Sequence, residues 1–302
     1  MTTTRTGPAV LSSEQPSTPV RRAAVLGKPI AHSLSPVIHR AGFTASGLTG
    51  WSYEAIECAE SELPDLVAGF GPEWAGLSLT MPLKEAALKL ATSATPAAIA
   101  AGVANTLVRQ EDGGWHADNT DILGMVRVLR EAGLGVSRGR HAVKTDPPRL
   151  TVLGGGGTAR AALAAAAELG GEVVTVVTRR PEARAELEPV AGALGLTLTG
   201  LDWSEAPGAF EADAVISTVP KGAADQLAGE VTWRAGTVFF DAIYDPWPTP
   251  LAASAIAAQV QVASGLDLLL AQALSQFEQF TGVEEAPEQA MREALDEAAR
   301  NR

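Results

Sequence analysis

Short apolar runs alternate along the chain with longer segments whose apolar residues recur every three or four positions. The short runs predict strands, and the helical spacing predicts helices. Strands are predicted at 23–27, 51–56, 76–80, 103–108, 114–117, 149–153, 172–177, 215–218 and 238–241. One helix is predicted to start at 35, and another to follow the segment 154–160 and end near 169. Further helices are predicted at 63–69, 82–90, 120–132, 266–281 and 287–299. This alternation predicts an α/β fold with parallel sheets, in which ligands bind at the carboxyl ends of the strands.

One pair of predicted strands departs from this alternation. The strands at 103–108 and 114–117 are separated by the turn sequence Glu111-Asp112-Gly113, which favours a β-hairpin. The chain of 302 residues is long enough for two domains, each with its own core.

A glycine-rich turn lies halfway along the chain, between the strand at 149–153 and an alanine-rich helix. Glycine lets backbone N–H groups approach a pyrophosphate, and the start of the helix adds partial positive charge. A strand, a glycine turn and a helix in this order are typical of a dinucleotide-binding Rossmann unit. The predicted phosphate cradle consists of Gly154, Gly155, Gly156, Gly157, Thr158 and Ala159.

The end of the next strand, about twenty residues later, bears on the choice of cofactor. An acidic residue at this point would accept a hydrogen bond from the 2′-hydroxyl of NAD. This chain instead has Thr178, Arg179 and Arg180, with Arg184 one turn into the following helix. Arginine suits a 2′-phosphate, so NADP(H) is the predicted cofactor. The alternative is that these arginines only form a solvated helix start.

Composition and charge exclude several classes of protein. The net charge of −12 argues against nucleic-acid or anionic-membrane partners, which need a basic surface. No apolar run approaches twenty residues, so no transmembrane helix is predicted. The single cysteine, Cys58, cannot form an internal disulfide, which fits a cytoplasmic location. Residues 1–20 are rich in Thr, Ser and Pro and predict a loose tail rather than a signal peptide.

Polar residues gather where several of the early strands end. Ser33 and Ser35 stand at a predicted helix start, where they could hold a small carboxylate. Further along, these strand ends carry Thr80, Lys84, Asn105, Thr106, Asp118, Asn119, Thr120 and Asp121. Hydroxyls, amides, an ammonium and carboxylates are what a polyhydroxylated cyclic acid would need. Taken singly, each has an ordinary alternative, and Lys84 could be a solvated lysine.

The ordered set of motifs resembles the shikimate dehydrogenase family from about residue 22 to 282. The resemblance rests on 27–36 (GKPIAHSLSP) with His39, 80–84 (TMPLK), 105–107 (NTL), 118–121 (DNTD), 154–160 (GGGGTAR), Arg179, 241–244 (DAIY), 249–251 (TPL) and 265–272 (GLDLLLAQ).

This resemblance implies NADPH-dependent reduction of 3-dehydroshikimate to shikimate, with Lys84 and Asp121 as the catalytic pair. It implies that the substrate is held by Ser33, Ser35, Thr80, Asn105, Tyr244 and Gln272. Thr218, Val219, Gly265 and Leu268 join the predicted cofactor contacts, and no metal is expected. The implied domains are an N-terminal α/β substrate domain at 21–121, to which closing helices at 266–302 return, and a C-terminal Rossmann NADP-binding domain at 122–265.

The chain also departs from the family's usual pattern. Ser78 stands where the family usually has Asn, and Arg40 where Asn often follows the histidine. Thr178 replaces a usual Asn, Leu268 replaces a methionine that often lines the nicotinamide pocket, and Ser217-Thr218-Val219-Pro220 replaces a common Asn-Ala-Thr run. None of these changes removes the Lys–Asp pair or the phosphate arginine.

Alternative functions share parts of this pattern. The nearest alternative is an NAD-dependent quinate/shikimate dehydrogenase, although Arg179 and the Ser33–Ser35 pair count against it. A non-catalytic NADP-binding sensor would have no need of both Lys84 and Asp121. A folate-type dehydrogenase would have Lys four residues after a Tyr, and neither Tyr53 nor Tyr244 is followed in this way. The sequence leaves open whether the protein is a homodimer.

Overall fold

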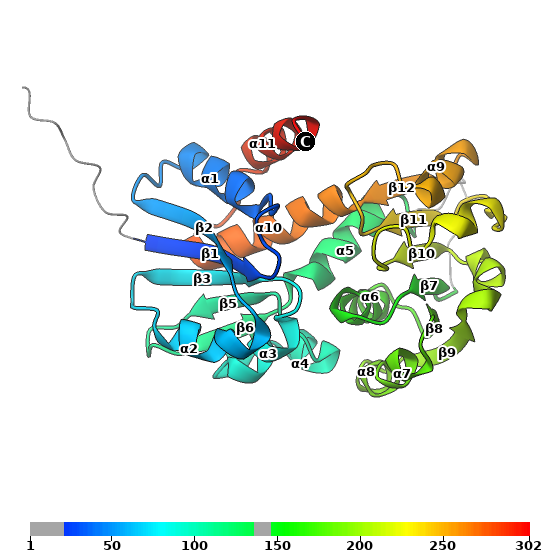
Figure 1. Cartoon of the computed structure of the whole chain (residues 1–302), viewed down its shortest axis with the longest axis horizontal. Helices are drawn as coiled ribbons and strands as arrows, with labels where there is room; N and C mark the ends of the chain where they lie inside the picture. Colours follow the sequence, from blue (N-terminus) through cyan, green and yellow to red (C-terminus); the bar gives the residue numbers. More distant parts are fainter. Residues whose placement is uncertain (1–20, 136–145) are drawn as a thin grey trace, which may run out of the picture.

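The computed structural model describes residues 21–135 and 146–302. Its strands form two six-stranded sheets, which lie in two lobes side by side (Figure 1). The tail predicted at 1–20 and most of the loop predicted at 137–148 lie outside the described residues.

The first sheet is mixed and has the strand order β2-β1-β3-β5-β6-β4. Its strands are β1 (Arg21–Gly27), β2 (Trp51–Glu57), β3 (Trp74–Leu79), β4 (Ser93–Ala94), β5 (Thr106–Arg109) and β6 (Trp115–Asp118). Strand β1 runs parallel to β2 and β3, whereas β5 is antiparallel to β3 and β6. The predicted hairpin is confirmed, with Leu107 opposite Ala117. The parallel pairing predicted from the β-α alternation holds for β1, β2 and β3, while the β5–β6 connection, too short for a crossover, gives the antiparallel pair that the hairpin predicted.

The second sheet is parallel throughout, with the order β12-β11-β10-β7-β8-β9. Its strands are β7 (Leu150–Leu153), β8 (Val173–Thr178), β9 (Thr197–Asp202), β10 (Ala214–Ser217), β11 (Val238–Asp241) and β12 (Gln261–Ser264). The strand order reverses between β7 and β10, and ligands of such sheets bind at the carboxyl ends of the strands there. The glycine turn follows β7 at this point, so the parallel order places it where a dinucleotide site belongs.

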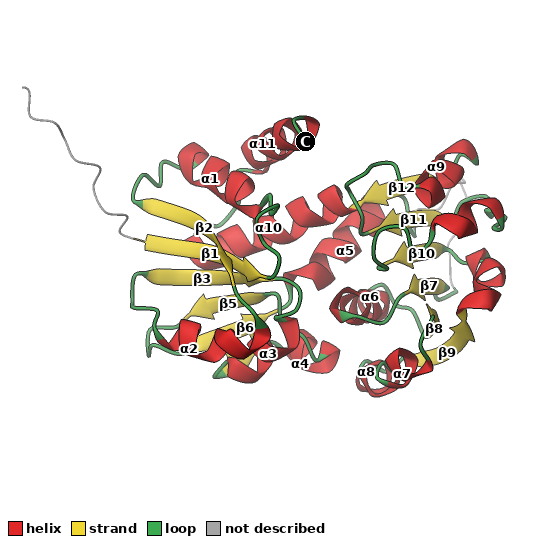
Figure 2. Cartoon of the chain, in the orientation of Figure 1, coloured by secondary structure: helices red, strands yellow, loops and turns green. Residues whose placement is uncertain are grey.

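Helices flank both sheets (Figure 2). They are α1 (Ser35–Ala45), α2 (Leu63–Ala68), α3 (Lys84–Leu90), α4 (Pro96–Ala101), α5 (Thr120–Glu131), α6 (Gly157–Glu168), α7 (Pro181–Ala185), α8 (Glu188–Ala193), α9 (Pro250–Ala257), α10 (Gly265–Thr281) and α11 (Glu288–Arg300). Short 3₁₀ helices lie at Glu60–Glu62, Trp203–Phe210 and Asp225–Gly229. Helix α10 contacts β3 and β5 of the first sheet and β12 of the second, and it packs along α5. These two helices therefore join the lobes.

Both sheets bury apolar side chains on each of their faces. In β1, Val25 faces the cluster under α1 and α10, while Leu26 faces the cluster beside α3. In β7, Val152 and Leu153 alternate in the same way between two clusters. Burial on both faces explains why these strands appear in the sequence as unbroken apolar runs.

Several short elements were not predicted from the sequence. Strands β4, β9 and β12 and helices α4, α8 and α9 are at most eight residues long, too short for periodicity to stand out. The edge strand β9 is largely exposed along its length, so it lacks an apolar run. Two boundaries differ as well, since the helix predicted from 82 begins at Lys84 and the strand predicted from 103 begins at Thr106.

Candidate active site

A cleft of about 640 Å³ opens at the switch point of the second sheet. The glycine turn forms its floor, and α6 starts at Gly157. Gly154 has φ +113°, a conformation that favours glycine. A Cβ at Gly155 would lie 2.9 Å from the Ala183 Cβ, so a side chain there would crowd the cradle. The turn therefore fits a dinucleotide pyrophosphate, which needs close backbone approach.

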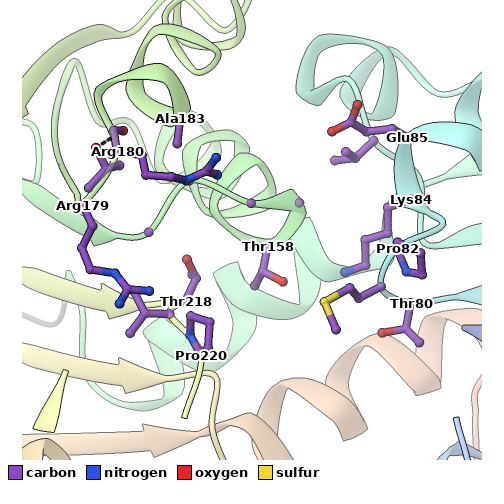
Figure 3. A pocket seen from close by; sticks show the side chains of 18 of the residues that line it. Thr80, Pro82, Lys84, Glu85, Thr158, Arg179, Arg180, Ala183, Thr218 and Pro220 are labelled. Atoms are coloured by element: carbon purple, nitrogen blue, oxygen red, sulfur yellow. Dashed lines mark hydrogen bonds between the residues drawn. The ribbon is translucent and has the colours of Figure 1, made fainter. Parts of the chain in front are cut away.

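The arginines lie at one end of this cleft. Arg179 and Arg180 are exposed, and neither guanidinium makes an ion pair among residues 21–135 and 146–302. The buried Thr178 hydroxyl donates to the Arg180 carbonyl, 3.0 Å away, and this bond holds the turn after β8. Figure 3 shows Arg179 and Arg180 across the cleft from Lys84, with Thr158 between them.

Arg184 has a different setting. Its guanidinium lies 3.3 Å from the Asp202 carboxylate, and its stem packs over Gly200. Of the predicted cofactor residues, those that line the cleft are Gly154, Gly155, Gly156, Gly157, Thr158, Thr178, Arg179, Arg180, Thr218 and Val219. Two predicted cofactor residues do not line the cleft. Arg184 lies outside it, and the side chain of Ala159, on α6, is fully buried in the core.

The Lys84 ammonium forms an ion pair with Asp121, at an Nζ–Oδ2 distance of 2.5 Å. Lys84 is the first residue of α3, and Asp121 is the second residue of α5. Their side chains are only 16% and 9% exposed, so the pair is largely shielded from water. Two segments 37 residues apart thus bring an ammonium and a carboxylate together, with Lys84 in the wall of the cleft.

A second cavity of about 330 Å³ adjoins the cleft on the side of the first sheet. The two cavities share Thr80, Lys84 and Thr158 in their walls. All the predicted substrate residues line the second cavity, namely Ser33, Ser35, Thr80, Asn105, Tyr244 and Gln272, together with Asp121. Gly265 and Leu268 line it too, rather than the larger cleft. Lys84 therefore lies at the junction of the two cavities, where a ligand bound in one can contact a ligand bound in the other.

Two amide side chains at this cavity have defined orientations. The Asn105 Oδ1 accepts from the Thr120 backbone N–H (2.8 Å) and the Thr106 hydroxyl (2.8 Å). The Asn105 Nδ2 is thereby left to donate toward the cavity, 3.5 Å from the Gln272 Oε1. The Gln272 Nε2 donates to the Leu269 carbonyl at 2.8 Å, so its Oε1 remains an acceptor. The cavity thus offers both donors and acceptors, as a ligand with several hydroxyls requires.

Tyr244 is carried by a loop that a buried carboxylate holds. Asp241, at the end of β11, accepts from the Thr249 hydroxyl (2.8 Å) and the Ile243 backbone N–H (3.1 Å). Burial raises the pKa of Asp241, and these hydrogen bonds partly oppose the rise. The carboxylate therefore ties both ends of the segment that presents Tyr244.

Two buried polar residues of the substrate cavity were not predicted as site residues. Ser78 was noted only as a departure from a family pattern, and Gln276 was not singled out. Gln276 lies one helical turn after Gln272 on α10, so the i,i+4 spacing could have indicated a shared face.

Two further features concern membrane-spanning helices and the single cysteine. In residues 21–135 and 146–302, no helix is both long and apolar enough to cross a membrane. Cys58, one residue after β2, is buried and has a free thiol.

Comparisons with known proteins agree with this geometry. Residues 25–107 match the model of the shikimate dehydrogenase substrate binding domain, and residues 265–295 match that of the shikimate 5′-dehydrogenase C-terminal domain. A Dinoroseobacter shibae protein named shikimate dehydrogenase (NADP(+)) is 34% identical over 267 residues, which cover 86% of this chain and 92% of that protein.

Solved structures give the same result. The crystal structure of Mycobacterium tuberculosis shikimate dehydrogenase superposes with a TM-score of 0.80 and 44% identity, covering 92% of this chain and 99% of that chain. A Thermus thermophilus shikimate 5-dehydrogenase in complex with NADP(H) and shikimate superposes with a TM-score of 0.75 and 30% identity, covering 92% and 99%.

Proposed function

Because the chain belongs to the shikimate dehydrogenase family, we propose that it catalyses the reversible reduction of 3-dehydroshikimate to shikimate with NADPH. The observation that carries this proposal is the Lys84–Asp121 pair at the junction of the two cavities. A carbonyl bound in the smaller cavity would lie beside the ammonium and within reach of a dinucleotide in the larger cleft.

The residues of the larger cleft fit NADPH, which supplies the hydride when it is bound. The backbone of the glycine turn would hold the pyrophosphate, and Arg179 and Arg180 would bind the 2′-phosphate. No carboxylate stands among residues 178–180 at the end of β8, and Asp202 on the neighbouring strand pairs with Arg184.

Lys84 would act on the substrate oxygen. Carbonyl reduction places negative charge on that oxygen, and a nearby ammonium stabilises it and can donate the proton. Asp121 holds the ammonium in place through the 2.5 Å contact. Its remaining acceptor capacity can bind a neighbouring substrate hydroxyl.

The remaining contacts would orient the ring. Ser35 is the first residue of α1, and its backbone N–H lies 3.3 Å from the Ser33 Oγ. The two hydroxyls at this helix start suit the substrate carboxylate. The donor Asn105 and the acceptor Gln272 suit the ring hydroxyls, and Tyr244 would complete the cavity wall.

An assay of NADP⁺ reduction with shikimate, with quinate and without substrate tests this function. We expect turnover with shikimate and NADP⁺, and much less with quinate or with NAD⁺. Equal use of quinate and NAD⁺ would favour the quinate/shikimate dehydrogenase instead. Binding of both ligands without turnover would favour a sensor.

Further assignments belong to the same proposal. The substrate domain would comprise 21–121 and 266–302, and the NADP-binding domain 122–265. The unpaired buried thiol of Cys58 supports a cytoplasmic location. The solution mass, measured by sedimentation, would decide between a monomer and a homodimer.

A further inference from the structure

A chain of buried hydrogen bonds lies behind the substrate cavity. The Tyr53 hydroxyl lies 2.6 Å from the Ser78 Oγ, and Ser78 donates to the Gln276 Oε1 at 2.6 Å. The Gln276 Nε2 donates to the Thr106 hydroxyl (2.9 Å) and to the Asn105 backbone carbonyl (3.1 Å). Every member is at most 4% exposed, so water cannot replace a missing partner.

Backbone groups fix the orientation of both amides in this chain. The Asn105 backbone carbonyl can only accept, so the Gln276 NH₂ must face it. The Gln276 Oε1 must then face Ser78. The Thr120 backbone N–H can only donate, so the Asn105 Oδ1 must face it. Flipping the Asn105 amide would set its NH₂ against the Thr120 N–H, and flipping the Gln276 amide would set its oxygen against the Asn105 backbone carbonyl.

These two orientations give the whole chain one direction. Thr106 donates to Asn105 and therefore accepts from Gln276. Ser78 has one proton, which it gives to Gln276, so the Tyr53 hydroxyl must donate to Ser78. Donation thus runs from Tyr53 to Asn105, and the free end of the chain is the Asn105 NH₂ at the cavity.

The far end of the chain is held rigidly. Tyr53 is fully buried and stacks on the His39 ring, with centroids 4.1 Å apart and planes 6° apart. Burial raises the Tyr53 pKa, while contacts with the Ser78 and Ser35 hydroxyls oppose the rise. With its proton committed to Ser78, the Tyr53 hydroxyl has no further proton to donate. The chain therefore runs from a buried aromatic ring to Asn105 at the cavity.

We propose that Gln276 and Ser78 are positioning residues that act together with the Thr120 backbone N–H: they fix the Thr106 hydroxyl as a second donor to the Asn105 Oδ1 and thereby hold Asn105 so that it can only donate to the substrate. This end of the cavity would accordingly select a substrate oxygen that accepts a hydrogen bond. The inference rests on the proposed function, since shikimate presents such a hydroxyl oxygen. It also gives a structural reason for Ser78, because a serine suits the 2.6 Å contacts on either side.

A double-mutant cycle tests whether Gln276 acts through Asn105. The variants are Gln276→Met, Asn105→Ala and the double variant, assayed for shikimate oxidation with NADP⁺. We expect Gln276→Met to lower kcat/KM for shikimate about 5- to 150-fold, because buried groups lose partners. The KM for NADP⁺ should stay within about twofold of the parent, since the cofactor cleft is untouched. On the Asn105→Ala background, Gln276→Met should lower kcat/KM less than about twofold.

A matched control is Gln279→Met, on the same helix, whose side chain bonds Asp118 instead of the cavity network. It should leave kcat/KM for shikimate within about twofold of the parent. If Gln276→Met fails to fold, Ser78→Ala replaces it in the cycle, and Ser78→Thr, which keeps the hydroxyl, should restore most of the lost activity.

The outcomes separate the two proposals. If the parent protein does not oxidise shikimate, the proposed function fails. Additive effects of Gln276→Met and Asn105→Ala in an active parent would overturn only the positioning role. An equal loss in Gln279→Met would do the same, because it would trace the effect to the stability of α10.

Discussion

Replacing Lys84 by Met removes the ammonium and keeps most of the side-chain volume. Loss of acid–base assistance lowers turnover by about 10²–10⁴-fold, or roughly 2.7–5.5 kcal/mol of barrier. The change also leaves the Asp121 carboxylate, 9% exposed, without its cation. Breaking a buried pair costs about 3–5 kcal/mol, and the partial exposure of Lys84 favours the lower end. A loss of about 3 kcal/mol would lower the Tm by about 5 °C, because the unfolding entropy is about 2.1 cal/mol/K for each of the 302 residues.

A second variant separates these two effects. In Lys84→Met with Asp121→Asn, no unpaired charge remains, so the Tm should return most of the way to that of the parent. Turnover should stay low, because the proton donor is still missing. The assay is steady-state NADP⁺ reduction with shikimate at 25 °C, where all variants are folded, alongside thermal unfolding followed by circular dichroism.

Turnover of Lys84→Met within a few-fold of the parent would refute the catalytic assignment. Recovery of turnover in the double variant would also refute it, since activity would then depend on stability and not on the ammonium. An unchanged Tm in Lys84→Met would show that the 2.5 Å pair contributes little to folding.

Three further predictions concern the substrate, the cofactor and pH. Ser35→Ala should raise the KM for shikimate roughly 5- to 150-fold, leaving a carboxylate oxygen without a donor, with the KM for NADP⁺ unchanged as the check on its location. Arg179→Ala should raise the KM for NADP⁺ about 10- to 150-fold and leave NAD⁺ use nearly unchanged. The control is Arg184→Ala, which should change the KM for NADP⁺ little because the Arg184 guanidinium pairs with Asp202. Burial lowers the pKa of His39 to about 3, so between pH 6.5 and 3 the unfolded state binds a proton that the folded state does not. The free energy of unfolding should therefore fall by about 2 kcal/mol from pH 7 to pH 5, and denaturant titrations of His39→Phe should lack that fall.

Much of this protein follows from local sequence patterns. The strand at Leu150–Leu153, the glycine turn and the helix after it are set by neighbouring residues, and they occur where predicted. The long helices at Thr120–Glu131 and Gly265–Thr281 are also close to their predicted bounds, because several turns of periodicity mark them. The arginines after β8 required only a count of residues from the glycine turn.

The family resemblance predicted which residues form the candidate site, and the tertiary structure shows which side chains contact them. Sequence position alone did not separate Arg179, in the cleft, from Arg184, which pairs with Asp202 on the adjacent strand β9. That pairing depends on a short, exposed edge strand that no periodicity revealed.

Only the folded chain brings Ser78, Asn105 and Gln276 together. Ser78 and Gln276 are 198 residues apart, and their contact depends on how α10 packs across β3 and β5. The direction of hydrogen bonding depends on which backbone N–H and carbonyl groups face each amide, and a one-dimensional pattern does not contain that information. The sequence by itself determined which long elements form and which chemical groups the chain carries, because these follow from local periodicity and residue type. Tertiary packing alone decided which of those groups face the cavity and in which direction they donate.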